Sequence, residues 1–149
     1  MEEIKLADET AQYIVIRLGQ EQYGIDISYI ENIVRMQHIT RVPKLAAYLK
    51  GVINLRGEVI PIMSLRLKMD LPEDEINKAT RIIIIKMEQC GTIGLIVDEV
   101  KEVVTLNLAE QVEKLAFNKD DKNNFVQGVG KYEGGLISLL DLNAVTAEK

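Results

Sequence analysis

The sequence has no tryptophan and only one cysteine and one histidine, and these scarcities limit the chemistry available to the chain. Cys90 cannot form an internal disulfide, and one cysteine with one histidine cannot supply a spaced set of zinc ligands. The longest apolar runs are far too short to cross a bilayer, and the acidic start MEEIKLADET is unlike a signal peptide. We therefore expect a reduced, cytoplasmic protein without metal or cofactor.

Motifs for catalysis and nucleotide binding are also missing. There is no G-x-S-x-G and no G-K-[ST], and Glu133 stands where a G-x-G-x-x-G motif beginning at Gly128 needs its third glycine. His38 lies in a polar stretch without a nucleophile elbow, which is typical of a solvated side chain. The acidic run at residues 120–124 lacks the glycine and glutamate spacing of an EF-hand loop. These absences favour a binding protein over an enzyme.

The charge balance argues against a nucleic-acid partner. The net charge is −5, acidic and basic residues are interleaved, and no basic stripe is present. With five tyrosines, two phenylalanines and no tryptophan, the chain also offers few side chains on which bases can stack.

Because aromatic residues are only 5% of the chain, the interior must be built from isoleucine, leucine and valine. The β-branched members of this set favour strands. The sequence also contains a repeat. The segment that begins at Gly24 matches the segment that begins at Gly94 at an offset of 70, and the segment that begins at Gly51 matches that at Gly128 at an offset of 77. Short strands separated by glycine turns, repeated twice, predict two small β-barrels that pack together as one folding unit.

Within each half, short runs rich in isoleucine, leucine and valine, separated by polar turn residues, predict strands and tight turns. The predicted strands are residues 13–18, 23–27, 81–87 and 92–97, followed in each half by a hairpin turning at 54–57 or at 133–135. Three short helices are predicted as well. One follows the Ser28/Glu31 capping box, one begins at Pro43, and one is capped by Asp141.

We interpret residues 1–149 as a single domain with two lobes. The first barrel is placed at 13–80 and the second at 81–145, with residues 1–12 as an N-terminal segment able to pack on the second barrel. The long, polar stretch from Thr105 to Phe125 is interpreted as a surface excursion.

Four stretches of the chain resemble the CheW family of bacterial chemotaxis coupling proteins. They are YGIDISYIENIVR, ITRVPKLAAYLKGVINLRGEVIPIMSLRLKM, GLIVDEVKEVV and QGVGKYEGGLISLLDL, and the resemblance extends from about Tyr13 to about Val145. The resemblance implies a mainly β fold of two SH3-like five-stranded barrels with a few short helices. It also implies a non-catalytic adaptor in arrays under the inner membrane, with a chemoreceptor cytoplasmic domain and the regulatory domain of the chemotaxis histidine kinase as partners.

Two other functions stay open on the sequence. One is a CheW-like scaffold in another chemosensory pathway, such as surface motility, and the other is a β-barrel that binds a small ligand. A ligand-binding barrel requires a pocket with converging polar groups, which no motif in the sequence indicates.

Arg56 is the leading candidate for partner binding, because it places a planar cation among aliphatic residues, a composition typical of interface anchors. The alternative is a hairpin-tip arginine that only keeps the turn soluble. Ile30, Ile33 and Val34 are expected on one helical face, either lining a groove for a receptor helix or packing in the core. The candidate partner-binding residues are Ile30, Glu31, Ile33, Val34, Gly51, Asn54, Leu55, Arg56, Gly57, Val59, Val103 and Gly128.

Overall fold

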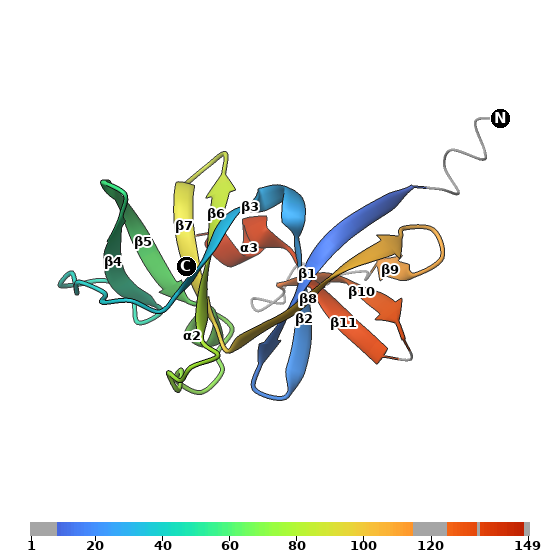
Figure 1. The fold of residues 1–149 in the computed structure, drawn as a ribbon, viewed down its shortest axis with the longest axis horizontal. Helices are drawn as coiled ribbons and strands as arrows, with labels where there is room; N and C mark the ends of the chain where they lie inside the picture. The colour runs from blue at the N-terminus through green and yellow to red at the C-terminus, as the bar shows by residue number, and fades with distance from the viewer. Residues whose placement is uncertain (1–8, 115–124, 134, 148–149) are drawn as a thin grey trace. The chain divides into compact units, whose positions relative to one another are not determined.

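A computed structural model describes residues 9–114, 125–133 and 135–147. The chain is mainly β, with two sheets and a few short helices (Figure 1), so the predicted fold class is confirmed. The described residues form two compact units. Unit 1 contains the residues up to Ser28 and from Lys101 onwards, and unit 2 spans Tyr29–Val100.

Unit 1 is built on a six-stranded sheet with the order β8-β1-β2-β11-β10-β9. Its strands are β1 (Thr10–Leu18), β2 (Glu21–Asp26), β8 (Glu99–Asn107), β9 (Val112–Lys114), β10 (Val126–Tyr132) and β11 (Gly135–Leu140). The sheet has one strand more than the five expected for each barrel, because the short β9 pairs with β10.

Unit 2 is built on a five-stranded sheet with the order β3-β6-β7-β5-β4. Its strands are β3 (Ile30–Arg35), β4 (Leu49–Leu55), β5 (Glu58–Ser64), β6 (Arg81–Met87) and β7 (Gly91–Val97). The helices among the described residues are short: the 3₁₀ turn η1 (Ile27–Tyr29), α2 (Leu65–Lys68) and α3 (Leu142–Thr146).

Each sheet combines strands from both repeats. The β1–β2 hairpin of the first repeat joins β8, β10 and β11 of the second, whereas the β6–β7 hairpin of the second repeat joins β3, β4 and β5 of the first. In Figure 1 the blue β2 accordingly lies beside the red β11. The predicted lobes at 13–80 and 81–145 therefore differ from the units observed. The repeat identified equivalent strands, but each unit takes one hairpin from the other half of the chain.

Two parallel strand pairs join the repeats at equivalent positions. Leu139 of β11 is the register partner of Gly24 in β2, and Ile62 of β5 is the register partner of Gly94 in β7. A Cβ atom on Gly24 would lie 2.9 Å from Leu139 Cδ2, and one on Gly94 would lie 2.7 Å from Ile62 Cδ1. The repeated glycines therefore give the apolar side chain of the opposite repeat room to pack.

The cores of both units lie against these pairs. In unit 1, Leu139 belongs to a cluster of buried side chains, and in unit 2, Ile62 belongs to an isoleucine-rich one. The first cluster contains Tyr13, Val15, Leu106, Ile137 and Leu139. The second contains Ile53, Ile60, Ile62, Ile82, Ile84 and Ile96.

The helix predicted after Ser28 is wrong. The backbone makes one 3₁₀ turn and then enters strand β3 at Ile30, and the Ser28 amide donates a hydrogen bond to Asp26 Oδ1 at 2.9 Å. The local hydrogen bond therefore supports only a single helical turn. The β-branched residues that follow pair with the isoleucines of β6, for example Val34 with Ile82, and this pairing outweighs the helical spacing.

The helix predicted from Pro43 is wrong as well. Residues 41–48 form turns that lead into β4, and Lys44 has a φ of 64°, which an α-helix cannot accommodate. Upstream, Thr40 and Val52 exchange backbone hydrogen bonds of 2.8 and 2.9 Å, which draws this segment against β4.

The helix predicted at the C-terminal end is confirmed. Asp141 caps α3, because its side chain accepts hydrogen bonds from the amides of Asn143 and Ala144. The equivalent helix α2, capped by Ser64, was not predicted, because its residues continue the aliphatic run of β5.

The predicted surface excursion at 105–125 is ordered at its start. Strand β8 continues to Asn107, and Val112–Lys114 forms β9, so these residues belong to the sheet. Residues 115–124, with the acidic run at 120–124, lie outside the described residues, as do residues 1–8 of the N-terminal segment and position 134 of the second predicted turn.

Replacing Gly94 with alanine tests the fit between the repeats. The new Cβ would approach Ile62 and Ile82 to 2.7 and 2.8 Å, and both isoleucines are fully buried. Because overpacking a tight core costs about 1–3 kcal/mol, we expect Gly94→Ala to lower the free energy of unfolding by that amount.

The matched control is Gly135→Ala, whose Cβ would meet only the Tyr132 carbonyl oxygen, at 3.6 Å. We expect this control to change stability by about 0.5 kcal/mol or less. Urea denaturation of both variants measures the difference, and equal stability of the two would contradict the account.

Candidate functional site

The β4–β5 hairpin holds most of the candidate residues. Its two-residue turn consists of Arg56 and Gly57, with φ angles of 53° and 85°. Positive φ at both central positions is the geometry of a type I′ turn, which matches the twist of the flanking strands. Asn54 stabilises the turn, because its Oδ1 accepts a hydrogen bond of 3.0 Å from the Gly57 amide. The predicted turn at 54–57 is therefore confirmed.

Beside this turn lies a depression of about 350 Å³, which we call the β4–β5 depression. Its lining combines three charged side chains, Glu31, Arg56 and Glu58, with the apolar Leu55, Ile60 and Ile84 and with Asn32. The Arg56 side chain is exposed, and within the described residues its guanidinium has neither a hydrogen bond nor an ion pair. An exposed cation without a partner beside apolar surface is available to bind another molecule.

Three predicted residues, Glu31, Leu55 and Arg56, meet in this depression, although Glu31 comes from a different strand. The pairing of β3 with β6 shifts register between Ile30 and Asn32, and this bulge lets Glu31 and Asn32 both line the depression. Val59 lies on the same hairpin and is 63% exposed.

The other predicted residues of β3 do not share one face. Val34 packs against the core cluster of unit 2, and Ile33 points to the opposite side of the strand because neighbouring side chains alternate. Ile30, Ile33 and Val34 are all partly buried. The single helical face expected from their spacing therefore does not form, because these residues belong to a strand.

Gly51 and Gly128 are buried and serve close backbone contacts. A Cβ on Gly51, which has a φ of 136°, would lie 2.1 Å from the Thr40 carbonyl oxygen. A Cβ on Gly128 would lie 3.0 Å from the Glu113 carbonyl oxygen. Val103, on β8 of unit 1, is 50% exposed. The two glycines therefore shape the backbone, whereas Val103 presents apolar surface.

The β10–β11 hairpin of unit 1 carries a second depression, of about 430 Å³. It is lined by Gln111, Lys131, Tyr132, Glu133, Gly135 and Leu136. The Tyr132 hydroxyl donates a hydrogen bond of 2.6 Å to Glu102 Oε2, which raises the pKa of Tyr132 to about 12. Sequence reasoning placed Glu133 in the second predicted turn and did not single out the exposed Leu136.

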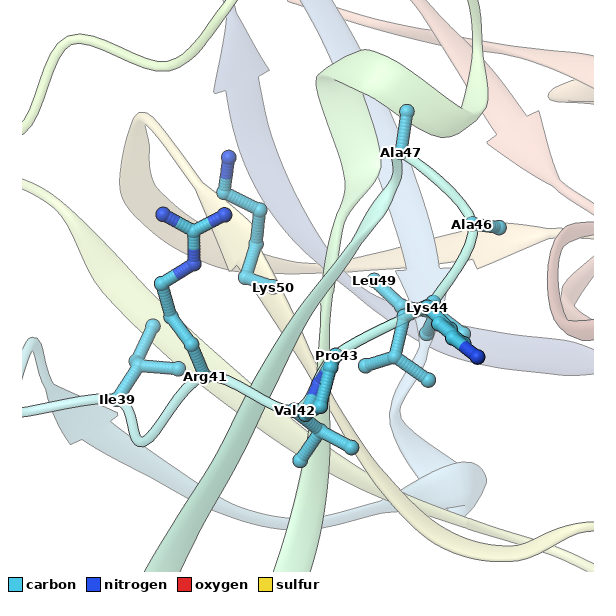
Figure 2. Close-up of a pocket in the computed structure, with 10 residues that line it drawn as sticks. Ile39, Arg41, Val42, Pro43, Lys44, Ala46, Ala47, Leu49 and Lys50 are labelled. Carbon is cyan, nitrogen blue, oxygen red and sulfur yellow. The ribbon is translucent and has the colours of Figure 1, made fainter.

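A third hollow, which we call the loop pocket, lies under residues 39–50 and has a volume of about 610 Å³ (Figure 2). Its lining includes Arg41, Lys44 and Lys50 among aliphatic side chains. Lys50 Nζ forms an ion pair of 2.6 Å with Glu73. The helix predicted from Pro43 gave no indication of this pocket.

A partly buried polar cluster surrounds α2. Arg66 binds Asp98 with two hydrogen bonds, Nε to Oδ1 at 2.8 Å and Nη2 to Oδ2 at 2.5 Å, and the hydrogen bond to Asp98 raises the Arg66 pKa. Ser64 donates a short hydrogen bond to Asp74 Oδ2, whereas Asp74 Oδ1 is buried without a hydrogen-bond partner. No sequence motif indicated this cluster, because its members are distant in the chain.

The described parts of the chain offer little for catalysis or metal binding. They contain no group of three histidine, cysteine or acidic side chains placed to hold a metal ion. Cys90 is exposed in the β6–β7 turn. None of the described helices is both long and apolar enough to traverse a bilayer.

Two small sheets whose hairpin tips expose unpaired charges beside apolar side chains are typical of a protein-binding module. Comparison with known proteins agrees with this class. Residues 12–149 match the CheW-like domain, so the chain belongs to the CheW family, and the resemblance found in the sequence is confirmed.

Relatives and a solved structure support the assignment along most of the chain. Chemotaxis protein CheW of Bacillus subtilis is 37% identical over 89% of this chain and 84% of its own length. Chemotaxis protein CheW of Helicobacter pylori is 33% identical, covering 93% of this chain and 82% of that protein. The crystal structure of the scaffolding protein TtCheW from Thermoanaerobacter tengcongensis superposes with a TM-score of 0.80 at 29% identity, covering 89% and 90% of the two chains.

The polar cluster around α2 generates a pH prediction. Burial raises the pKa of the Asp74 carboxyl, opposed by the Ser64 hydrogen bond and by the charges of Arg66 and Lys50 and reinforced by Asp98. Because the pKa of Asp74 is higher in the folded state than in the unfolded state, the folded protein is more stable when this carboxyl is protonated. That contribution is complete below the unfolded-state pKa and is lost as pH rises through the folded-state pKa.

We therefore expect Asp74→Asn, which keeps the shape without the charge, to be more stable than the original protein at neutral pH. The difference should shrink as pH falls towards about 4, where free aspartate takes up its proton. Urea denaturation across this range measures it. In the control Glu73→Gln the trend should run the other way, because Lys50 lowers the pKa of Glu73. An Asp74→Asn variant that is less stable at neutral pH would contradict the prediction.

Proposed function

We propose that this chain is a non-catalytic adaptor that couples transmembrane chemoreceptors to the chemotaxis histidine kinase. The observation that carries the proposal is the match to the CheW-like domain over residues 12–149, together with relatives named as chemotaxis proteins and as a scaffolding protein. The adaptor would act at receptor arrays beneath the inner membrane, with the receptor's cytoplasmic domain and the kinase's regulatory domain as its partners.

The surface of unit 2 supports this role. The β4–β5 depression offers the unpaired Arg56 guanidinium, a partly buried apolar floor and the exposed Val59 within one hairpin. Interface anchors are commonly arginine or large apolar side chains in such hollows, with a charged rim around them. The type I′ turn fixes the backbone at Arg56, so binding has to order only the side chain.

The adaptor role is tested by reconstitution with purified kinase and receptor. We expect the chain to raise kinase autophosphorylation only when receptor is also present, because an adaptor acts by holding two partners in one assembly. Equal stimulation of the kinase without receptor would argue against coupling.

The anchoring role of Arg56 is tested by Arg56→Glu. We expect the variant to unfold like the original protein, since exposed substitutions usually shift stability by about 0.5 kcal/mol or less. Its affinity for one of the two partners should fall by about 2 kcal/mol or more, the usual cost of losing a desolvated arginine anchor. Binding of the receptor cytoplasmic fragment and of the kinase regulatory domain is measured separately by calorimetry.

A matched control is Lys86→Glu, which reverses an exposed charge on β6 outside the depression. We expect this control to bind both partners as the original protein does. If Arg56→Glu and Lys86→Glu bind both partners equally well, Arg56 is a solubilising turn residue. A lowered unfolding temperature for Arg56→Glu would instead assign the side chain a role in stability.

A further inference from the structure

The stretch at residues 32–57 differs in charge from the rest of the chain. It contains five arginine and lysine residues and no aspartate or glutamate, whereas the chain as a whole has 23 acidic and 18 basic residues. The loop pocket lies within this stretch, and Arg41, Lys44 and Lys50 are part of its lining. The pocket is therefore a local concentration of positive charge on a protein of net charge −5, and it attracts anions.

The described side chains that line the loop pocket are of two kinds only. Three are the cations, and all the others are aliphatic; none is a carboxylate, an amide, a hydroxyl or an aromatic ring. Val42 and Leu45 are 41% and 40% exposed, so apolar surface at the pocket is open to a ligand. This lining complements an anion with an aliphatic body. It has no side chain suited to a sugar or a nucleobase.

The size and anchoring of the loop pocket suit a small molecule. Its volume of about 610 Å³ falls within the roughly 300–1,000 Å³ of small-molecule sites. The loop is held at both ends. Thr40 and Val52 exchange backbone hydrogen bonds of 2.8 and 2.9 Å, and the Ser64 amide donates one of 2.7 Å to the Tyr48 carbonyl oxygen. The pocket therefore exists before a ligand arrives, which lowers the entropic cost of binding.

The three cations of the loop pocket do not point the same way. Figure 2 shows the side chains of Arg41 and Lys50 extending in one direction, whereas Lys44 extends in another. Arg41 has no hydrogen bond or ion pair within the described residues. Lys50 pairs at 2.6 Å with Glu73, whose side chain is 66% exposed. A ligand carboxylate would therefore find an unpaired guanidinium and an ammonium whose present partner is an exposed acid.

We propose that the loop pocket binds a single-chain aliphatic carboxylate, with its chain against the aliphatic lining and its carboxylate between Arg41 and Lys50. A guanidinium can bind a carboxylate through two parallel hydrogen bonds. In the empty pocket Glu73 takes the place of the ligand at Lys50, and the ligand displaces it. The hollow is concave and formed by one short loop, which suits a free chain better than the flat surface of a bilayer. This site goes beyond the proposed adaptor function, since it involves neither receptor nor kinase.

NMR titration of the isotope-labelled chain with octanoate, decanoate and dodecanoate, below their micelle concentrations, tests the site. We expect saturable shifts of the amides at 39–50. Affinity should rise about fourfold for each methylene that enters the pocket, which corresponds to about 0.8 kcal/mol per buried methylene. Octanol has the chain of octanoate without the charge, and we expect it to bind about tenfold more weakly.

Substitutions at exposed positions test the roles of the individual charges. We expect Arg41→Gln to weaken dodecanoate binding about tenfold, and Lys44→Gln to weaken it by about twofold or less. Glu73→Gln should bind dodecanoate about twofold to fivefold more tightly, because it removes the acid that competes for Lys50. Lys86→Gln, an exposed cation on β6 outside the pocket, is the control and should bind like the original protein.

Four results would overturn the proposal. They are no saturable shift at 39–50 with dodecanoate up to about 1 mM, octanol binding as tight as octanoate, Arg41→Gln binding like Lys86→Gln, and no gain of affinity in Glu73→Gln.

Anionic phospholipid vesicles distinguish the source of the ligand. If they shift the amides at 39–50 and free dodecanoate does not, the loop contacts a membrane surface and the proposal is wrong. The chain-length series uses the unmodified protein, so it tests the site even if a variant fails to fold. No arm contains receptor or kinase, so failure of the adaptor function would leave these results unaffected.

Discussion

The contact of Leu139 with Gly24, and of Ile62 with Gly94, is the constraint on which the rest of the structure depends. Both contacts join a strand of one repeat to a parallel strand of the other, and both require a residue without a Cβ. Through them, β11 and β5 become interior strands of their sheets. A side chain at Gly24 would press against Leu139 of β11, and one at Gly94 would press against Ile62 of β5.

This arrangement divides each hairpin into a fixed base and an exposed tip. In β5, Ile60 and Ile62 are buried in the core of unit 2, whereas Glu58 and Val59 are exposed. In β11, Ile137 and Leu139 are buried, whereas Leu136 is exposed. Substitutions at the tips can therefore change charge and partner at little cost to folding. The opposite charges of Arg56 and Glu133 illustrate this freedom on two otherwise equivalent hairpins.

Much of the fold was predictable from the sequence because its main signals are local. The run of isoleucines at residues 82–85 located β6 to the residue, and the Asn54–Gly57 turn followed from turn chemistry. The helices at Ser28 and Pro43 were mispredicted because strand pairing with β6 and β4 outweighs local spacing. The exchange of hairpins between repeats could not be predicted, since a repeat shows which strands are equivalent but not which strands pair.

The candidate site was predicted in part for the same reason. Arg56, Asn54 and Gly57 lie on one continuous hairpin, so their proximity could be inferred. Glu31 lines the depression because the strand bulges between Ile30 and Asn32, and no sequence pattern predicted this bulge. The loop pocket and the cluster around Arg66 and Asp74 depend on how the chain folds back on itself, and only the folded structure reveals them.

The most direct test of the proposed adaptor surface measures, residue by residue, which parts of the chain a partner contacts. Backbone amide resonances of the isotope-labelled chain would be followed by NMR during titration with receptor cytoplasmic fragment and, separately, with kinase regulatory domain. The account predicts that the Arg56 and Gly57 amides and those lining the β4–β5 depression shift with at least one partner, while the buried Gly94 amide stays in place. Binding by both partners that leaves the β4–β5 hairpin unperturbed would contradict it.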